Sequence, residues 1–419
     1  MIYILGIAIC IAALLQMGMW MSTSISAMRF NQKQLQISRE IVEQQIKLAQ
    51  EKHDTEQKNL SGNWDGFREF YVDRLEKNVE MVTSVYLKPV DGKPIAEFKP
   101  GQHISLQLHL SGESKPLIRC YSLSTGPGKD YYRISVKAVP PPYDNPQLPP
   151  GKASNYINYQ LMVGDRIDIK APSGSFYLEE KGDSPVILLA GGIGITPMLS
   201  MLDHLVSQDS NRLIVLFYGV RNSMEHAFKD YLQTAANRFP NVHVINCYSE
   251  PLETDVLNRD YHMQGYVNVD LMKQVLPTSQ CRYYLCGPPP FMESVRDGLL
   301  GWGVPDGRIN FEAFGPASIK KASKQENSTI DRQAANAAVK FAASDRSLTW
   351  NGEQDSILDL AEANDVHLPS GCRAGSCGTC ATKIISGQVQ YPEGIQPDCE
   401  PGECLICVAK PKGNVSLDA

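Results

Sequence analysis

The chain has 419 residues, of which 42% are hydrophobic and 8% aromatic, so it can form several domains with hydrophobic cores and is not expected to be disordered. The formal net charge of −6 leaves no broad basic surface and argues against nucleic acid as a partner. Eleven cysteines do not suit a disulfide scaffold, because six of them lie from Cys372 to Cys407. Such clustering indicates a metal site.

The first 28 residues are predicted to anchor the chain in a membrane. They carry no charged side chain, and Ile2–Met21 is almost wholly apolar and would span about 30 Å as a helix. A cleaved signal peptide is one alternative, but it would begin with basic residues, which this segment lacks. A buried core helix is the other, but a core helix of this length would have a polar face. Arg29, Lys33 and Arg39 follow the span and no Lys or Arg precedes it, so the positive-inside rule places the remainder in the cytoplasm. Residues 29–62 read as a helical spacer, with a short coiled coil as the alternative.

Residues 63–180 are predicted to form a small antiparallel β-barrel that binds flavin. Alternating strands are expected at 81–87, 103–110, 131–139 and 165–171. The segment RCYSLS (119–124) offers a guanidinium for pyrophosphate, a Tyr ring for the isoalloxazine and a Ser hydroxyl for its N5 edge. The segment GKASNY (151–156) opens a short helix whose N–H groups can hold phosphate. Taken alone, Arg119 could be an ordinary arginine on a strand, and residues 151–156 could be an ordinary helix start with a capping residue. The candidates are Arg119, Tyr121, Ser122, Lys137, Gly151, Lys152, Ala153 and Ser154.

The proline-rich insert Pro140–Pro150 separates the two flavin segments. It is expected to form either a lid over the adenosine end of the flavin cofactor or a stiff loop.

Residues 181–315 are predicted to form a parallel α/β domain that binds a nicotinamide nucleotide. Apolar strands alternate with helices expected at 196–206 and 227–236. Three glycines follow the first strand, and a helix start follows them, so the pyrophosphate of a nucleotide can approach the backbone. This turn is not the standard dinucleotide fingerprint and is a weak signal alone. The candidates are Gly191, Gly192, Gly194, Thr196 and Pro197.

Residues 316–337 have linker composition, and residues 338–419 are predicted to bind an iron–sulfur cluster. Cys372, Cys377 and Cys380 follow the spacing C-x4-C-x2-C, and small residues between them would let the loop wrap a [2Fe–2S] cluster. Zinc is the alternative, although structural zinc sites favour cysteines arranged as two paired knuckles. A further cysteine is available at Cys407 as a fourth ligand, with Cys404 as its rival and Cys399 as a spare.

Two resemblances give these segments an expected fold. Residues 338–419 resemble the plant-type ferredoxins, which implies an α+β β-grasp domain whose fourth ligand falls on Cys407. The two flavin segments, LLAGGIGITPML (188–199), YYLCGPPPF (283–291) and EAFGP (312–316) resemble the ferredoxin–NADP reductase superfamily, most closely its flavohaemoglobin and hybrid-cluster-protein reductase branch.

The second resemblance implies roles for individual residues. Ser122 and Glu312 would lie near the flavin N5, and Cys286, Gly287 and Pro288 beside the nicotinamide, with Cys286 near the hydride path as neither ligand nor nucleophile. Phe314 would cover the flavin, with a core aromatic as the alternative. Arg221 would lie at the adenosine end and could hold a 2′-phosphate, but no second basic residue follows before Lys229. NADH is therefore expected, with NADPH as the alternative, and FAD is expected, with FMN as the alternative.

The expected function is electron transfer from NADH through FAD and the [2Fe–2S] cluster to a membrane-associated acceptor, such as an oxygenase, hydroxylase or fatty-acid desaturase. The first alternative is a respiratory or quinone-reducing subunit. The F subunit of the sodium-translocating NADH:quinone reductase contains the same modules, but its ferredoxin module comes first. The second alternative is a non-enzymatic redox sensor. The full set of hydride-transfer segments argues against it, because a sensor does not need them.

Overall fold

The structure is a computed structural model that describes residues 64–419 except 65, 114–115, 142–144, 181, 315–336, 353, 367, 371–372, 374, 376–377 and 393–398. The predicted anchor (1–28), the spacer (29–62) and nearly all of the predicted linker lie outside the described residues. Among the described helices, none has the length and apolar character needed to cross a bilayer. The elements below all belong to one unit, Gly62–Ala419.

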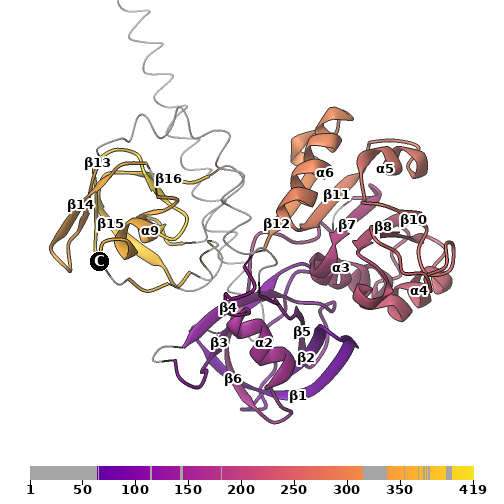
Figure 1. The fold of residues 1–419 in the computed structure, drawn as a ribbon, viewed down its shortest axis with the longest axis horizontal. Coiled ribbons are helices and arrows are strands. Elements are labelled where there is room, and N and C mark those ends of the chain that lie inside the picture. The colour runs from indigo at the N-terminus through magenta and orange to yellow at the C-terminus, as the bar shows by residue number, and fades with distance from the viewer. Residues whose placement is uncertain are drawn as a thin grey trace, which may run out of the picture. The chain divides into compact units, whose positions relative to one another are not determined.

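The first sheet is the predicted antiparallel barrel. Its strands are β1 (Arg68–Val79), β2 (Val82–Pro89), β3 (His103–Leu108), β4 (Leu117–Ser122), β5 (Tyr132–Lys137) and β6 (Arg166–Ser173), in the order β4-β3-β6-β1-β2-β5. Figure 1 shows these strands together. An isolated bridge between Leu123 and Ile134 joins the two ends of this order. Helix α2 (Lys152–Tyr159) packs Ala153 and Ile157 against the barrel core. Ile104 and Leu106 of β3 are fully buried in the barrel core, and the residues His103 and Ser105 on the other face of the strand are buried as well.

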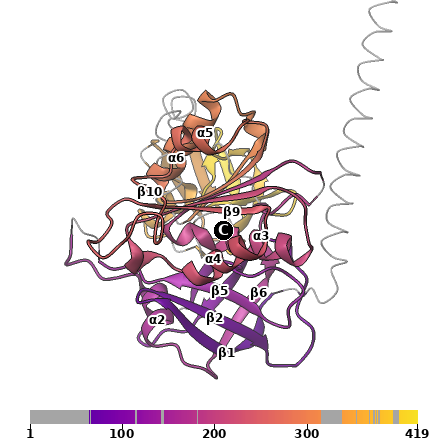
Figure 2. The same ribbon diagram turned by 90° about the vertical axis from the view of Figure 1, so that its right-hand side faces the viewer.

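The second sheet is parallel, as predicted. Its strands are β7 (Val186–Gly191), β8 (Ile214–Val220), β9 (Val242–Tyr248), β10 (Met263–Gln264), β11 (Arg282–Gly287) and β12 (Ile309–Ala313), in the order β10-β9-β8-β7-β11-β12. Helices α3 (Ile195–Ser207) and α4 (Lys229–Arg238) cover one face, and α5 (Val269–Val275) and α6 (Pro289–Gly301) cover the other (Figure 2). The strand order reverses between β7 and β11. In sheets of this kind, ligands bind at that switch point, beyond the carboxyl ends of the strands.

The third sheet is mixed and belongs to the cysteine-rich part. Its strands are β13 (Ala337–Phe341), β14 (Arg346–Trp350), β15 (Ala381–Ser386), β17 (Glu403–Leu405) and β19 (Val415–Leu417), in the order β14-β13-β19-β15-β17. The short strands β16 (Val389–Gln390) and β18 (Lys410–Pro411) form a separate pair. Helix α9 (Ile357–Glu362) begins at Ser356, whose Oγ accepts a hydrogen bond from the Asp359 N–H at 3.1 Å. The sheet begins at Ala337, one residue before the expected domain start, because Ala337 pairs with Trp350.

Helix α3 is fastened to the barrel by one carboxylate, an arrangement we call the Asp203 clasp. Asp203 Oδ2 accepts hydrogen bonds from Thr125 Oγ1 and from the Gly126 N–H, both at 2.8 Å, and Oδ1 accepts one from Tyr231 OH at 3.2 Å. A Cβ at Gly126 would lie 2.9 Å from the backbone nitrogen of His204, so the close approach requires glycine. The clasp ties the loop after β4 to the helix that starts at the glycine turn.

Candidate active site

The predicted nucleotide turn lies at the carboxyl end of β7. The 3₁₀ helix η1 (Gly192–Gly194) connects β7 to α3, and a Cβ at Gly194 would lie only 2.2 Å from the carbonyl oxygen of Cys286 on β11. At Gly192 φ is +55°, and no described atom lies within 4 Å of the position that a Cβ would take. The turn is therefore tight against β11 on one side and open on the other, as a backbone that receives a phosphate must be.

Thr196 and Pro197 lie in the first turn of α3, as predicted from the sequence. The Thr196 Oγ1 donates a hydrogen bond to the carbonyl oxygen of Ile193 at 3.1 Å, and both side chains are buried. Thr196 thus stabilises the turn from within.

Cys286 is a buried neutral thiol beside the switch point. It is fully buried on β11, and its register partner on β12 is Glu312. Burial raises the pKa of the Cys286 thiol well above its ordinary value, and the nearby Glu312 carboxylate acts in the same direction. A thiol held neutral is a poor nucleophile and metal ligand, which agrees with the role expected for Cys286.

A polar network joins the two sheets at this point. Ser122 Oγ on β4 donates a hydrogen bond to Glu312 Oε2 at 3.1 Å, and Glu312 Oε1 lies 3.6 Å from His103 Nδ1 on β3. The other ring nitrogen of His103 lies 3.5 Å from Ser173 Oγ on β6. His103 is the register partner of both Ser122 and Ser173, so these residues cross three neighbouring strands. The structure brings the predicted pair Ser122 and Glu312 together.

His103 is a site residue that the sequence did not indicate. It begins the strand segment HISLQL, where it reads as an ordinary member of a buried face, and it belongs to no motif. Only the approach of Glu312 from the other sheet reveals it. No signal in the local sequence could have found it.

The remaining residues of the flavin segment offer the right donors. Arg119 and Tyr121 are half-buried on β4, within four residues of Ser122. Arg119 Nη1 donates to the carbonyl oxygen of Ile118 at 2.7 Å. Burial raises the pKa of Tyr121 above its ordinary value, so its phenol stays protonated. A guanidinium, a phenol and a hydroxyl on one strand suit a flavin and its pyrophosphate.

The helix α2 begins where the phosphate segment was predicted, but two of its candidates have partners within the chain. Ser154 Oγ accepts a hydrogen bond from the Val139 N–H and donates one to the carbonyl oxygen of Gly151, both at 3.1 Å. Lys152 forms an ion pair with Glu113. The backbone N–H groups after Gly151 are thus the part of this segment best suited to a phosphate.

Two further candidates are Lys137, which forms an ion pair, and Phe314, which is partly exposed. The Lys137 Nζ lies 2.7 Å from Glu225 Oε2, where η2 (Ser223–Glu225) follows β8. Phe314 follows β12 and is 36% exposed, so it is not a core aromatic.

Two of the four predicted cluster ligands are described, and they lie together. The Sγ atoms of Cys380 and Cys407 are 2.8 Å apart, and both residues are buried. Cys372 and Cys377 lie outside the described residues. The rival Cys404 is fully buried on β17. The sulfur of Cys407 lies beside that of Cys380, as two ligands of one cluster would, and Cys407 remains the predicted fourth ligand.

Comparison with known families assigns a domain to each sheet. Residues 87–177 match the oxidoreductase FAD-binding domain, residues 188–297 the oxidoreductase NAD-binding domain, and residues 340–412 the 2Fe-2S iron-sulfur cluster binding domain. FAD, NADH and a [2Fe–2S] cluster are accordingly the cofactors of this chain, and its chemistry is that of an oxidoreductase.

Individual relatives agree with this division. The flavohemoprotein of Bacillus anthracis is 39% identical over 257 residues, which are 61% of this chain and 63% of that protein. The chain thus spans less than two thirds of that relative. The flavohem-like FAD/NAD-binding domain of nitric oxide dioxygenase from Vibrio cholerae is 32% identical with a TM-score of 0.53, covering 59% of this chain and 99% of that one. Phthalate dioxygenase reductase is 27% identical with a TM-score of 0.53, and the match covers 85% of this chain and 98% of that one.

Proposed function

We propose that this chain, which belongs to the family of flavohem-like FAD/NAD-binding oxidoreductases, passes electrons from NADH through FAD to its own [2Fe–2S] cluster and then to a separate acceptor. The observation that carries the proposal is the hydrogen bond between Ser122 of the barrel and Glu312 of the nucleotide sheet. It brings the flavin and nucleotide segments to one place beside the glycine turn. FAD, when bound, links a donor of two electrons to a cluster that accepts one at a time.

The polar network has a definite task in this reaction. One NADH and two oxidised clusters give NAD⁺, two reduced clusters and one proton, and that proton must leave the site. The Glu312 carboxylate lies between the Ser122 hydroxyl and the His103 imidazole, so it can accept the proton and pass it to His103. Ser173 lies at the far ring nitrogen of His103. We therefore assign Glu312 and His103 to proton movement.

The acceptor is proposed from the chemistry of a relative. Phthalate dioxygenase reductase transfers electrons from pyridine nucleotides to a [2Fe–2S] cluster, and this chain resembles it over most of its length. A redox partner of the oxygenase class, such as an oxygenase, a hydroxylase or a fatty-acid desaturase, is accordingly our proposed acceptor. The apolar run Ile2–Met21, followed by Arg29, Lys33 and Arg39, supports a single membrane anchor with the redox domains on the cytoplasmic side. Such an anchor would confine donor and acceptor to one surface.

Anaerobic reduction by NADH tests the electron path. Full-length protein should lose the flavin absorption and gain the paramagnetic signal of the reduced cluster in a single mixing experiment. Reduction of the flavin without reduction of the cluster would overturn the proposed path.

The proton path is tested on variants. Glu312→Gln should slow NADH-dependent cluster reduction at least about tenfold, because a positioned acid or base typically contributes 10²–10⁴-fold. His103→Gln should slow it less and increase the solvent deuterium isotope effect. His109→Gln is the matched control, since His109 is exposed just beyond the same strand. Equal isotope effects in the two histidine variants would contradict a role for His103.

A further inference from the structure

We infer that Glu225 and Glu250 set the preference of this chain for NADH over NADPH, because they neutralise Arg221 where the 2′-phosphate of NADPH would lie. The inference rests on the proposed function and deepens it. It concerns only the nucleotide end of the site.

The position follows from the topology of the parallel sheet. β7 ends at the glycine turn, and β8 is both the next strand in the chain and its neighbour in the sheet. In nucleotide-binding α/β sheets, side chains beyond the end of this second strand read the adenosine ribose. An acidic residue there accepts from the 2′-hydroxyl, whereas an arginine accommodates a 2′-phosphate. Arg221 is the first residue after β8.

The charges at this position alternate in sign. Lys137 Nζ lies 2.7 Å from Glu225 Oε2, Glu225 Oε1 lies 3.9 Å from Arg221 Nη1, and Arg221 Nε lies 3.9 Å from Glu250 Oε2. These four charges sum to zero. Binding of a phosphate dianion needs cationic donors that are not already shared with carboxylates. A ribose 2′-hydroxyl, in contrast, can donate to a carboxylate oxygen.

The three side chains remain accessible to a nucleotide. Arg221 is 61% exposed and Glu250 is 70% exposed, whereas Glu225 is 24% exposed. Ion pairs of such exposure contribute little to the stability of the fold. Their effect on a bound phosphate is different, since each carboxylate would face the dianion directly.

Hydrogen bonds hold the backbone of the segments that carry Glu225 and Glu250 next to Arg221. The Glu250 N–H donates to the carbonyl oxygen of Arg221 at 2.9 Å, and Asn222 Nδ2 donates to the carbonyl oxygen of Glu250 at 3.3 Å. Asn222 also caps η2, because its side chain accepts from the Met224 N–H at 3.2 Å. The turn that carries Glu225 and the loop that carries Glu250 are thus bonded to the same strand end.

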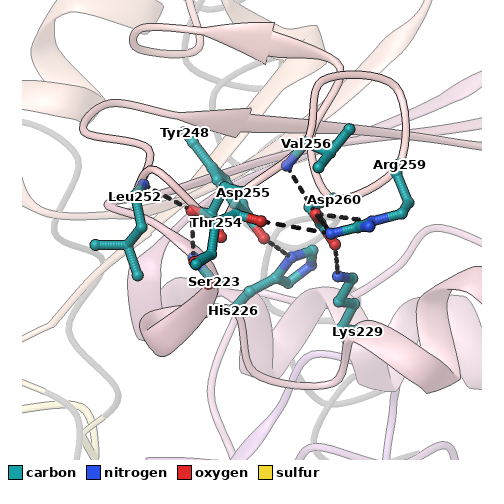
Figure 3. Close-up of polar contacts among 10 residues, drawn as sticks. All are labelled: Ser223, His226, Lys229, Tyr248, Leu252, Thr254, Asp255, Val256, Arg259 and Asp260. Atoms are coloured by element: carbon teal, nitrogen blue, oxygen red, sulfur yellow. Dashed lines mark hydrogen bonds and ion pairs between the residues drawn. The ribbon is translucent and has the colours of Figure 1, made fainter.

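Figure 3 shows how the rest of this loop, residues 249–262, is held. Asp255 Oδ2 accepts hydrogen bonds from the Leu252 N–H at 2.9 Å and from the Ser223 N–H at 3.3 Å, so it joins the loop to η2. Asp260 pairs with Lys229 at the start of α4 and accepts from the Val256 N–H. The loop is therefore fastened at two points, and Glu250 keeps its place beside Arg221.

The test uses full-length protein with Glu250→Gln, Glu225→Gln and the double variant. Glu253→Gln is the matched control, because it removes the same charge from the same loop three residues away. The first measurement is the affinity for adenosine 2′-monophosphate relative to adenosine 5′-monophosphate, by calorimetry. The second is the ratio of kcat/KM for NADPH and NADH with ferricyanide as acceptor.

We expect Glu250→Gln to raise relative 2′-monophosphate affinity about threefold, and the double variant about tenfold, for exposed charges at moderate salt. The kcat/KM ratio should rise in parallel, and Glu253→Gln should change neither quantity. Adding Arg221→Gln to the double variant should remove the gain, because the freed guanidinium would be the phosphate donor. A double variant that matches the control in both measurements would overturn the inference.

Failure of the proposed function gives a different result. In that case NADH would not reduce the cluster of the unaltered protein, whether or not it reduces the flavin. If NADH reduces both the flavin and the cluster but the unaltered protein prefers NADPH, only the inference about Glu225 and Glu250 fails.

Discussion

Replacing Gly194 with alanine tests the close approach of α3 to β11. The new Cβ would lie 2.2 Å from the Cys286 carbonyl oxygen, 2.5 Å from its carbonyl carbon and 2.8 Å from the Gly287 nitrogen, whereas ordinary contacts begin at 3.4 Å. The strand and the helix start must therefore separate by more than about 1 Å. All three atoms belong to the backbone of a strand paired on both sides, so they cannot rotate away as a side chain can.

The loss of stability in Gly194→Ala should exceed that caused by an extra methylene group in an ordinary core. Extra methylenes in a packed core cost about 1–3 kcal/mol where side chains adjust, so we expect about 3 kcal/mol or more here. The separation would also shift Cys286 and its register partner Glu312, so NADH-dependent ferricyanide reduction should fall at least about tenfold.

Two other glycines serve as controls for this variant. Gly192→Ala has a φ of +55° and open space, and should cost only the backbone strain of about 1–2 kcal/mol. Gly307→Ala has neither a clash nor a positive φ and should change stability by less than about 0.5 kcal/mol. Urea unfolding followed by circular dichroism measures all three. A Gly194→Ala protein that is no less stable than Gly192→Ala would refute the reasoning.

Three further predictions concern other parts of the chain. Burial lowers the pKa of His226 to about 4, whereas its value in the unfolded chain is about 6.5. The unfolded chain therefore binds the proton more readily than the folded protein. The free energy of unfolding should fall by about 3 kcal/mol as the pH drops from 6.5 to 4. Urea unfolding at several pH values should show this loss in the natural protein and a flatter profile in His226→Gln. Cys407→Ala should lose the visible absorption and paramagnetic signal of the cluster while Cys404→Ala keeps them, and the opposite pattern would exchange their assignments. Deletion of residues 1–62 should preserve FAD content and NADH oxidation with ferricyanide and slow only delivery to a membrane acceptor, so loss of the flavin would contradict the anchor proposal.

The sequence predicts those features of this fold that depend on local pattern. Every residue of β7 is buried, as expected for a short apolar run covered on both faces, and the glycines after it fix the turn. The charged strand β1 was not predicted as a strand, because only Phe70 and Val72 of its residues are buried and the usual alternation is hidden. Its pairing with β2 and β6 makes it a strand.

The partners of polar side chains could not be predicted in the same way. Lys137, a predicted cofactor-binding residue, forms an ion pair with Glu225, 88 residues away, which the sequence did not indicate. Ser154 was expected to hold phosphate, and its hydroxyl bonds to Val139 and Gly151. Ser122 and Glu312 were placed together only through a family resemblance, since 190 residues separate them. Such contacts are decided by tertiary packing, which no local pattern encodes.

The Asp203 clasp sets the unit in which this protein can be recombined. A chimaera that exchanged the barrel alone would remove both donors to Asp203 Oδ2 and leave Tyr231 as a donor to Oδ1, and the loss should cost about 1–3 kcal/mol. The same exchange would require glycine at the position of Gly126, where the backbone of His204 comes closest. Grafts that move residues 68–313 as one piece keep both the donors to Asp203 and the glycine at position 126. The barrel and the parallel sheet should therefore be transferred together when the protein is recombined.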